Sequence, residues 1–163
     1  VNNAGIADGS LLEMTSANNL KKIFQINFFS QIRLTQLLLR LLKKSKNGSI
    51  INLGSVSGII AERGTLSYGS SKAALMFSTK VMANELSVYK IRVNCVAPSA
   101  TDTDMLNQMD KAGKEKLLQN SLLQKPHTVA EVASKVLFLA SEKSIHINGQ
   151  IVRIGEGKKN WTT

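Results

Sequence analysis

Short apolar runs alternate with longer helical segments along this chain, and that alternation constrains the fold more than any other feature. The runs at residues 49–54, 91–97 and 149–154 predict strands, and Val1 has the character of the last residue of another. They lack the polar–apolar alternation of a strand with one wet face, so both faces of the sheet should be covered. We therefore predict an α/β fold, the C-terminal part of a doubly wound parallel sheet with right-handed helical crossovers.

The segments between the strands predict helices, and the first of them is unusually apolar. Residues 17–44 and 66–88 have helical periodicity, and residues 104–124 form a lysine-rich segment that we expect to be helical and mobile. Thr128 and Glu131 have the spacing of a capping box, which predicts the start of a further helix. Because residues 17–44 are apolar on more than one face, we expect a second subunit to cover the outer side of that helix.

The composition fits one globular domain that is a piece of a longer protein. The chain has 163 residues, of which 43% are hydrophobic and 20% charged, proportions that suit a single packed core. It begins with Val1 rather than methionine, and three strands with the end of a fourth are few for a doubly wound sheet. We expect residues 1–163 to be one half of a single domain.

Cysteine use and hydropathy limit where the protein can work. Cys95 is the one cysteine and lies in an apolar run, so it predicts a core residue, no intrachain disulfide and a reducing compartment, the cytoplasm. The most apolar segment, residues 23–42, is not expected to span a membrane, because it is interrupted by Gln25, Asn27, Gln31, Arg33, Gln36 and Arg40. The chain does not open with a signal-peptide pattern.

The formal charge of +10 raises the question of an acidic partner. The lysines occur as scattered pairs and only 5% of the residues are aromatic, so a nucleic-acid surface with stacking platforms is not expected. Most of the charge should form a solvated surface. An acidic small molecule or an acidic carrier protein is the remaining alternative.

Tyr68 and Lys72 are four residues apart at the start of the helix predicted over residues 66–88. Side chains at this spacing leave the same helix face, which puts a phenol beside an ammonium group. The pKa of a free phenol is too high for rapid proton exchange near neutrality, and a nearby cation lowers it. The pair is therefore a candidate general acid.

Polar loops should converge beside this pair. Loops that leave the carboxyl ends of parallel strands meet at one edge of the sheet, where ligands bind. Residues 3–5, 54–55 and 98–103 are such loops. The expected cleft thus contains the Ser55 hydroxyl, the Tyr68 phenol and the Lys72 ammonium group.

These motifs, in this order and spacing, resemble those of the classical short-chain dehydrogenase/reductase family. The matching stretches cover nearly the whole chain: Asn2-Asn3-Ala4-Gly5, Asn27, Ser55, Tyr68-Gly-Ser-Ser-Lys72, Asn94-Cys-Val-Ala-Pro98, Thr103-Asp104-Met105 and Asn148-Gly149-Gln150. The chain is most similar to 3-oxoacyl-acyl-carrier-protein reductases, although related sugar, polyol and steroid enzymes share these motifs. The resemblance implies the catalytic half of a Rossmann-type domain.

The resemblance implies a role for each of four residues. Tyr68 would give a proton to the substrate carbonyl, or remove it in the oxidative direction, and Ser55 would hold the carbonyl oxygen. Lys72 would lower the pKa of Tyr68 and bind the nicotinamide ribose. Asn27 would bend its helix and hold a water molecule that links Lys72 to solvent. No metal is implied.

The resemblance also implies a nicotinamide cofactor, NADP or NAD, with NADP favoured. Its channel would be lined by Asn3, Ala4, Gly5, Tyr68, Lys72, Pro98, Ser99, Thr101 and Thr103. Ser99 replaces the usual glycine and could restrict the loop. Tyr89 stands where carrier-dependent reductases commonly have arginine, while Lys46 and Lys90 could still dock an acidic carrier. The usual glycine-rich phosphate-binding turn does not occur in this sequence.

Simpler explanations remain open for several of these positions. Ser55 could be a loop or capping residue, Asn27 a buried side chain bonded to backbone, and Asn3 a brace between strands. His127 and His146 are expected to be structural or surface residues. At the level of function, the alternative to an NAD(P)-dependent oxidoreductase acting on a small or carrier-bound substrate is a truncated, non-catalytic relative that mediates interactions. A homo-oligomer, dimer or tetramer, through residues 17–44 and 66–88 is expected in either case.

Overall fold

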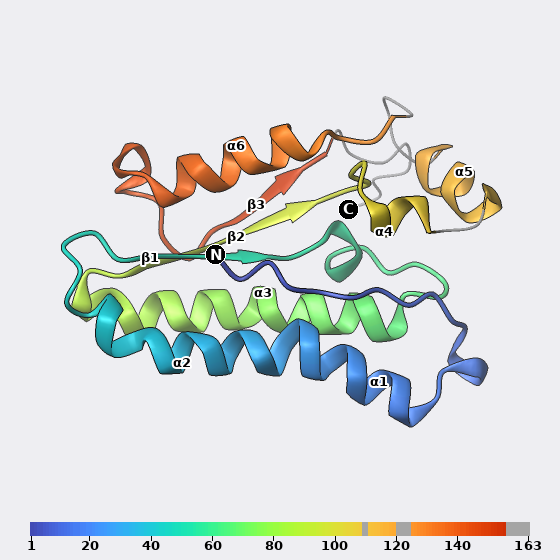
Figure 1. Ribbon diagram of the computed structural model, residues 1–163, viewed down its shortest axis with the longest axis horizontal. Coiled ribbons are helices and arrows are strands. Elements are labelled where there is room, and N and C mark those ends of the chain that lie inside the picture. Colours follow the sequence, from blue (N-terminus) through green and yellow to red (C-terminus); the bar gives the residue numbers. More distant parts are fainter. Residues whose placement is uncertain (109–110, 120–124, 156–163) are drawn as a thin grey trace.

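The computed structural model describes residues 1–108, 111–119 and 125–155. These residues form a parallel sheet of β1 (Ser49–Leu53), β2 (Arg92–Pro98) and β3 (Ile151–Ile154), in the order β1-β2-β3 (Figure 1). The predicted α/β fold with a parallel sheet is confirmed. Asn2 adds a parallel bridge to Asn52 on the free side of β1, so the start of the chain extends the sheet by one position.

Helices cover both faces of this sheet, as the uninterrupted apolar strands predicted. The helix expected over residues 17–44 consists of α1 (Ala17–Phe24), a π-helical turn η2 (Gln25–Phe29) and α2 (Ser30–Leu42). It lies beside α3 (Leu66–Leu86) on one face, and α6 (Val129–Ala140) lies on the other (Figure 1).

Each face has its own apolar cluster. Under α3 the buried members are Ile50, Ala83, Leu86, Ile91 and Val93. Under α6 they are Ile51, Leu53, Val96, Leu139 and Ile154. Neighbouring residues of one strand point to opposite faces, which is why Ile50 and Ile51 belong to different clusters.

Short elements fill the connections. Four 3-10 turns are present in the described ranges: η1 (Leu12–Met14), η3 (Val56–Gly58), η4 (Ser87–Tyr89) and η5 (Glu142–Ser144). The segment predicted to be helical over residues 104–124 contains α4 (Asp104–Asn107) and α5 (Lys111–Gln119), and its residues 109–110 and 120–124 lie outside the described part. The capping box before α6 is confirmed, with the Thr128 amide donating to Glu131 at 2.6 Å and the Glu131 amide to the Thr128 hydroxyl at 3.2 Å.

A buried polar ladder ties the helices to the sheet. The Asn2 side-chain amide donates to Asn52 Oδ1 at 2.8 Å and to Thr35 Oγ1 at 3.1 Å, and Asn52 Nδ2 donates to Thr79 Oγ1 at 2.8 Å. Thr35 belongs to α2 and Thr79 to α3, so one chain of hydrogen bonds joins both helices to the sheet. The bracing role considered for Asn3 therefore belongs to Asn2, and Asn3 itself is exposed.

Arg92 fastens the end of α6 to β2. Its guanidinium group donates to the carbonyl oxygens of Leu139 at 2.9 Å and Ser141 at 3.2 Å, and to Ser144 Oγ at 3.1 Å. A cation at these terminal carbonyls suits the negative end of the helix dipole.

The outer side of α2 is apolar and uncovered in the single chain. Leu37 and Leu41 are 61% and 64% exposed, while the buried side of the same helix includes Gln31 and Thr35. Within the described residues, the structure has no helix long and apolar enough to cross a membrane.

Candidate active site

The site lies at the edge of the sheet where the strands end. Ser55 follows β1 by two residues, Pro98 ends β2, and α3 begins at the same end of the molecule (Figure 1). The loops that follow these strands thus lie at the same end of the molecule as Tyr68 and Lys72 in the first turns of α3.

A close approach of η3 to α3 brings Ser55 to Tyr68. Ser55 is buried, and its hydroxyl accepts a hydrogen bond from the Ser57 amide at 3.2 Å. A Cβ atom on Gly69 would lie 2.6 Å from the Ser57 carbonyl oxygen, closer than packing allows. Glycine at this position therefore lets the Ser55 loop sit against the first turn of α3. Ser55 acts as a loop cap, and its side chain is close enough to Tyr68 to lower the pKa of the phenol.

The pKa of Tyr68 differs from the sequence-based prediction. Burial raises the pKa of the phenol above its ordinary value, and the hydrogen bond with Ser55 offsets part of that rise. The Lys72 ammonium nitrogen lies 5.8 Å from the centre of the Tyr68 ring. The expected lowering by Lys72 is wrong for this structure because the loss of hydration around the phenol dominates.

Lys72 is itself held in a confined position. Its side chain is buried, and its ammonium group donates to the Leu53 carbonyl oxygen at 2.7 Å. Burial lowers the pKa of Lys72 to about 8, and the nearby Cys95 opposes that change. Cys95 is buried, as predicted for a core residue, and burial raises the pKa of its thiol to about 11.

Asn27 lies in the π-helical turn, so the predicted local departure from a regular helix is confirmed. Its side chain is fully buried. The Asn27 side-chain oxygen accepts from the Ile6 amide at 2.8 Å, and its nitrogen donates to the Ile6 carbonyl oxygen at 2.9 Å and to Ser71 Oγ at 3.0 Å. Asn27 is therefore a buried side chain bonded to backbone, one of the alternatives considered from the sequence. It also connects the loop at Ile6 to Ser71 of α3.

The loop after Asn2 approaches Lys72 closely. A Cβ atom on Gly5 would lie 3.4 Å from both Lys72 Nζ and Asn27 Oδ1. Asn3 and Ala4 are exposed, and Gly5 is half-buried. Exposed backbone beside a lysine ammonium group, with two donor hydrogens beyond its bond to Leu53, fits the hydroxyl groups of a nucleotide ribose.

The loop after β2 is held by its own hydrogen bonds. The Ser99 amide donates to the Ile154 carbonyl at 2.8 Å, and Ser99 Oγ would lie 3.0 Å from a Cβ atom on Gly155. The side chain added by Ser99 thus packs against Gly155. Thr101 Oγ1 donates to the Ser99 carbonyl at 3.1 Å, and Thr103 Oγ1 donates to the Thr101 carbonyl at 3.2 Å. Pro98, Ser99, Thr101 and Thr103 are all half-buried.

The histidines and possible metal ligands add little to this site. His127 pairs through its backbone with the loop after β2, and its Nδ1 lies 3.7 Å from Glu131 Oε2. His146 is exposed. The described residues contain no group of three acidic, cysteine or histidine side chains able to hold a metal ion.

The sequence analysis missed two residues of the site. Ser71 receives the hydrogen bond from Asn27, and Gln31 donates to the Ala4 carbonyl oxygen at 2.6 Å. The available signal was spacing, since Gln31 lies four residues after Asn27 on one helix face and Ser71 lies three after Tyr68.

Known proteins resemble this chain over nearly its whole length. A family model described as Enoyl-(Acyl carrier protein) reductase matches residues 1–158. The 3-oxoacyl-[acyl-carrier-protein] reductase FabG of Thermotoga maritima is 36% identical over 96% of this chain and 64% of its own length. The chain therefore spans just under two thirds of that relative.

Solved structures match a similar share of the chain at lower sequence identity. A 4-hydroxyisoleucine dehydrogenase complexed with NADH is 28% identical with a TM-score of 0.86, covering 96% of this chain and 65% of the other. A gluconate 5-dehydrogenase from Burkholderia cenocepacia in complex with NADP and tartrate is 26% identical with a TM-score of 0.89, covering 94% and 61%. Together with the family match, these likenesses show that the chain belongs to the short-chain dehydrogenase/reductase family.

Proposed function

We propose that the full-length protein is an NAD(P)-dependent oxidoreductase that interconverts a carbonyl group and a secondary alcohol. The observation that carries this proposal is the meeting of the Ser55 hydroxyl and the Tyr68 phenol beside the buried Lys72. Two hydroxyl groups that can donate to one oxygen atom suit a carbonyl on which negative charge develops.

In the proposed mechanism the nicotinamide cofactor, when bound, supplies or accepts the hydride. Ser55 orients the carbonyl oxygen, and Tyr68 transfers the proton as general acid or base. Burial favours the neutral phenol, which is the form that donates a proton during reduction. Lys72 would hold the ribose hydroxyls. Asn27, whose two amide hydrogens are already bonded, would hold through an acceptor oxygen a water molecule that returns protons from solvent.

The remaining cofactor contacts come from two loops. Asn3, Ala4 and Gly5 would line the channel beside Lys72. Pro98, Ser99, Thr101 and Thr103 would meet the nicotinamide amide. We favour NADP over NAD, and the structures of relatives with NADH and with NADP are compatible with either. A fully buried free thiol in Cys95 suits the cytoplasm.

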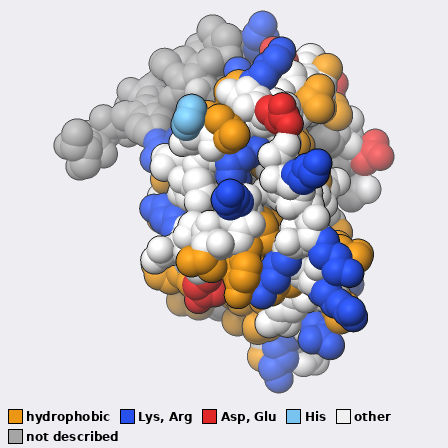
Figure 2. All heavy atoms as spheres, turned by 90° about the vertical axis from the view of Figure 1, so that its left-hand side faces the viewer, with side chains coloured by type: hydrophobic (Ala, Val, Ile, Leu, Met, Phe, Trp, Pro, Cys, Tyr) orange, Lys and Arg blue, Asp and Glu red, His pale blue; other side chains and the backbone are white. Residues whose placement is uncertain are grey.

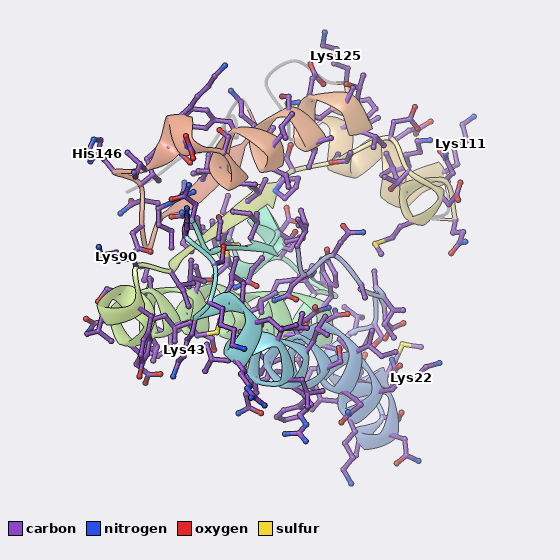
Figure 3. All side chains as sticks on the ribbon, turned by 60° about the vertical axis from the view of Figure 1, so that its left-hand side comes forward. Lys22, Lys43, Lys90, Lys111, Lys125 and His146 are labelled. Atoms are coloured by element: carbon purple, nitrogen blue, oxygen red, sulfur yellow. The ribbon has the colours of Figure 1, made fainter. Side chains whose placement is uncertain are left out.

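For the substrate we propose a 3-oxoacyl thioester on an acyl carrier, as in the reductase of Thermotoga maritima. The end of the molecule opposite the catalytic edge carries far more Lys and Arg than acidic side chains (Figure 2). Lys90 lies there, close to Lys43 at the C-terminal cap of α2 (Figure 3), and Lys46 follows three residues later. Tyr89 packs under Lys43, whose nitrogen lies 3.7 Å from the ring centre.

We also propose that two copies associate through the outer sides of α2 and α3. The exposed apolar residues there are Phe29, Leu34, Leu37, Leu38, Leu41, Leu66, Phe77 and Val81. Each of these side chains is at least 40% exposed, and a standard interface buries about 800 Å² on each partner. An antiparallel arrangement would bring the basic end of one copy toward the catalytic edge of the other, where a docked carrier could deliver its substrate.

The test of the proposed reaction is Tyr68→Phe in the full-length protein, with Tyr89→Phe as the matched control. We expect NADPH-dependent reduction of a 3-oxoacyl thioester, with kcat at least about 100-fold lower in Tyr68→Phe, since positioned acid–base catalysis is worth that much. The control keeps an aromatic ring under Lys43 and should retain activity. A Tyr68→Phe rate within twofold of wild type would contradict the assignment.

Cofactor titration separates this function from the non-catalytic alternative. We expect the fluorescence of NADPH to change on binding full-length protein and to change weakly or not at all with residues 1–163 alone. A full-length protein that binds neither NADPH nor NADH, yet self-associates, would support the interaction protein instead.

A further inference from the structure

Ser71 is a fully buried serine between the two residues of the catalytic pair. Its hydroxyl accepts from Asn27 Nδ2 at 3.0 Å and donates to the Tyr68 carbonyl oxygen at 2.7 Å. A hydroxyl group has one donor hydrogen, so the bond to Tyr68 fixes the direction of the chain: Asn27 donates to Ser71, and Ser71 donates to Tyr68.

The Asn27 side chain has no freedom to change this arrangement. Both hydrogens of its amide are used, one by the Ile6 carbonyl and one by Ser71, and its oxygen accepts from the Ile6 amide. One carboxamide thus has two arms. The first arm holds the loop that contains Gly5 and Ile6, and the second reaches the first turn of α3.

The second arm acts on the turn that carries Tyr68. A serine hydroxyl bonded to the carbonyl three residues earlier competes with the regular helix bonds and adjusts the local bend. The direction in which the Tyr68 side chain leaves the helix depends on that bend. A small displacement of a reacting group has a large effect on rate, since a 1 Å misplacement can cost about 100-fold.

We propose that Ser71 is a positioning residue, through which the Asn27 amide fixes the turn that presents the Tyr68 phenol to the substrate. The inference rests on the proposed oxidoreductase function and assigns separate roles to the two sets of hydrogen bonds that Asn27 makes. The Ile6 arm of Asn27 serves cofactor binding, and the Ser71 arm serves proton transfer.

The direct test is Ser71→Ala in the full-length protein, with Ser70→Ala as control. Ser70 is the adjacent serine and is exposed. Ser71→Ala should lower kcat about tenfold, while the Kd for NADPH and the KM for the carbonyl substrate stay within twofold, because the Ile6 arm is intact. Ser70→Ala should match wild type in all three constants. Ser71→Cys, a weaker donor of similar volume, should give an intermediate kcat.

A double-mutant cycle separates positioning from a merely structural role. Asn27→Ala should lower kcat and also weaken NADPH binding, and adding Ser71→Ala to it should lower kcat no more than twofold further. Losses that multiply would show two independent effects and overturn the inference. So would a Ser71→Ala enzyme whose kcat is within twofold of wild type, or whose Kd for NADPH rises as much as its kcat falls.

If Asn27→Ala does not fold, the inference is tested by the variants at residue 71 alone. It requires that kcat fall in the order wild type, Ser71→Cys, Ser71→Ala, and any other order contradicts it. Tyr68→Phe is measured alongside. An active wild type, an inactive Tyr68→Phe and a normal Ser71→Ala overturn the role of Ser71 alone. A wild-type protein without carbonyl reductase activity overturns the proposed function and this inference together.

Discussion

Burial affects Tyr68 and Lys72 in opposite directions, because each is pushed toward its neutral form. The pKa of the phenol rises and that of the lysine falls to about 8. The pair is thus a neutral phenol beside an ammonium group that loses its proton more readily than an exposed lysine. Lys72, rather than Tyr68, then sets the alkaline side of the pH range in which the pair is correctly protonated.

This ordering predicts the pH dependence of the reduction. The kcat/KM of the full-length enzyme should be level below the pKa of Lys72, about 8, and fall above it as the ammonium group is lost. Lys72→Arg keeps a cation at all accessible pH values, so the residual activity of this variant should lack that alkaline fall. A steady-state pH profile of both proteins checks this. An alkaline limb near the ordinary pKa of lysine in wild type would contradict it.

At this scale the motif spacing placed Ser55, Tyr68 and Lys72 together, but it did not give the direction of the Tyr68 pKa. That direction depends on how far packing dehydrates the phenol, which no spacing encodes. Spacing also could not decide between Asn2 and Asn3 as the brace. Adjacent residues of an extended chain face opposite ways, so the outcome depends on a register that only the paired strand fixes.

Among the elements, the strands were predicted within a few residues because each is an uninterrupted apolar run, and the long helices because their apolar periodicity is continuous. The π-helical turn at Gln25–Phe29 was expected only through the resemblance at Asn27, since one inserted residue barely changes a pattern that is apolar on several faces. The end of α4 at Asn107 was not predicted, because weak periodicity in a lysine-rich segment does not indicate where a helix ends.

The packing of η3 on α3 makes a prediction at this scale. Gly69→Ala would put a Cβ atom 2.6 Å from the Ser57 carbonyl oxygen, so η3 has to move and take Ser55 with it. We expect a loss of roughly 1 to 3 kcal/mol in the free energy of unfolding, and a lower kcat. Denaturant unfolding and steady-state kinetics measure the two effects. Gly9→Ala is the control, since nothing lies within 4 Å of a Cβ atom at that position. Equal free energies of unfolding for the two variants would show that η3 can move without destabilising the protein, which would contradict the prediction.

For the whole molecule, residues 1–163 leave the outer side of the helix at residues 17–44 exposed, as its apolar pattern predicted. The buried side of α2 is partly polar, through Gln31 and Thr35, while Leu37 and Leu41 face outward. Leucines on the surface beside polar side chains in the interior support the proposed association of two copies.

Self-association through this surface is testable by charge insertion. Leu37→Glu should weaken dimerisation of the full-length protein at least about 100-fold, because a carboxylate would be buried without a partner. Sedimentation equilibrium gives the dissociation constants. Ile145→Glu, at an exposed apolar residue on the far side of the sheet beside η5, should leave the α2–α3 dimer intact. A Leu37→Glu protein that associates as tightly as wild type would place the interface elsewhere.

The Arg92 clamp has a consequence for the order in which the chain assembles. The carbonyl oxygens that end α6 depend on a guanidinium group contributed 47 residues earlier, from the middle strand. Contacts of long sequence separation form late, because the intervening loop has to be closed first. We therefore expect the last turn of α6 to become ordered only once β2 is in place.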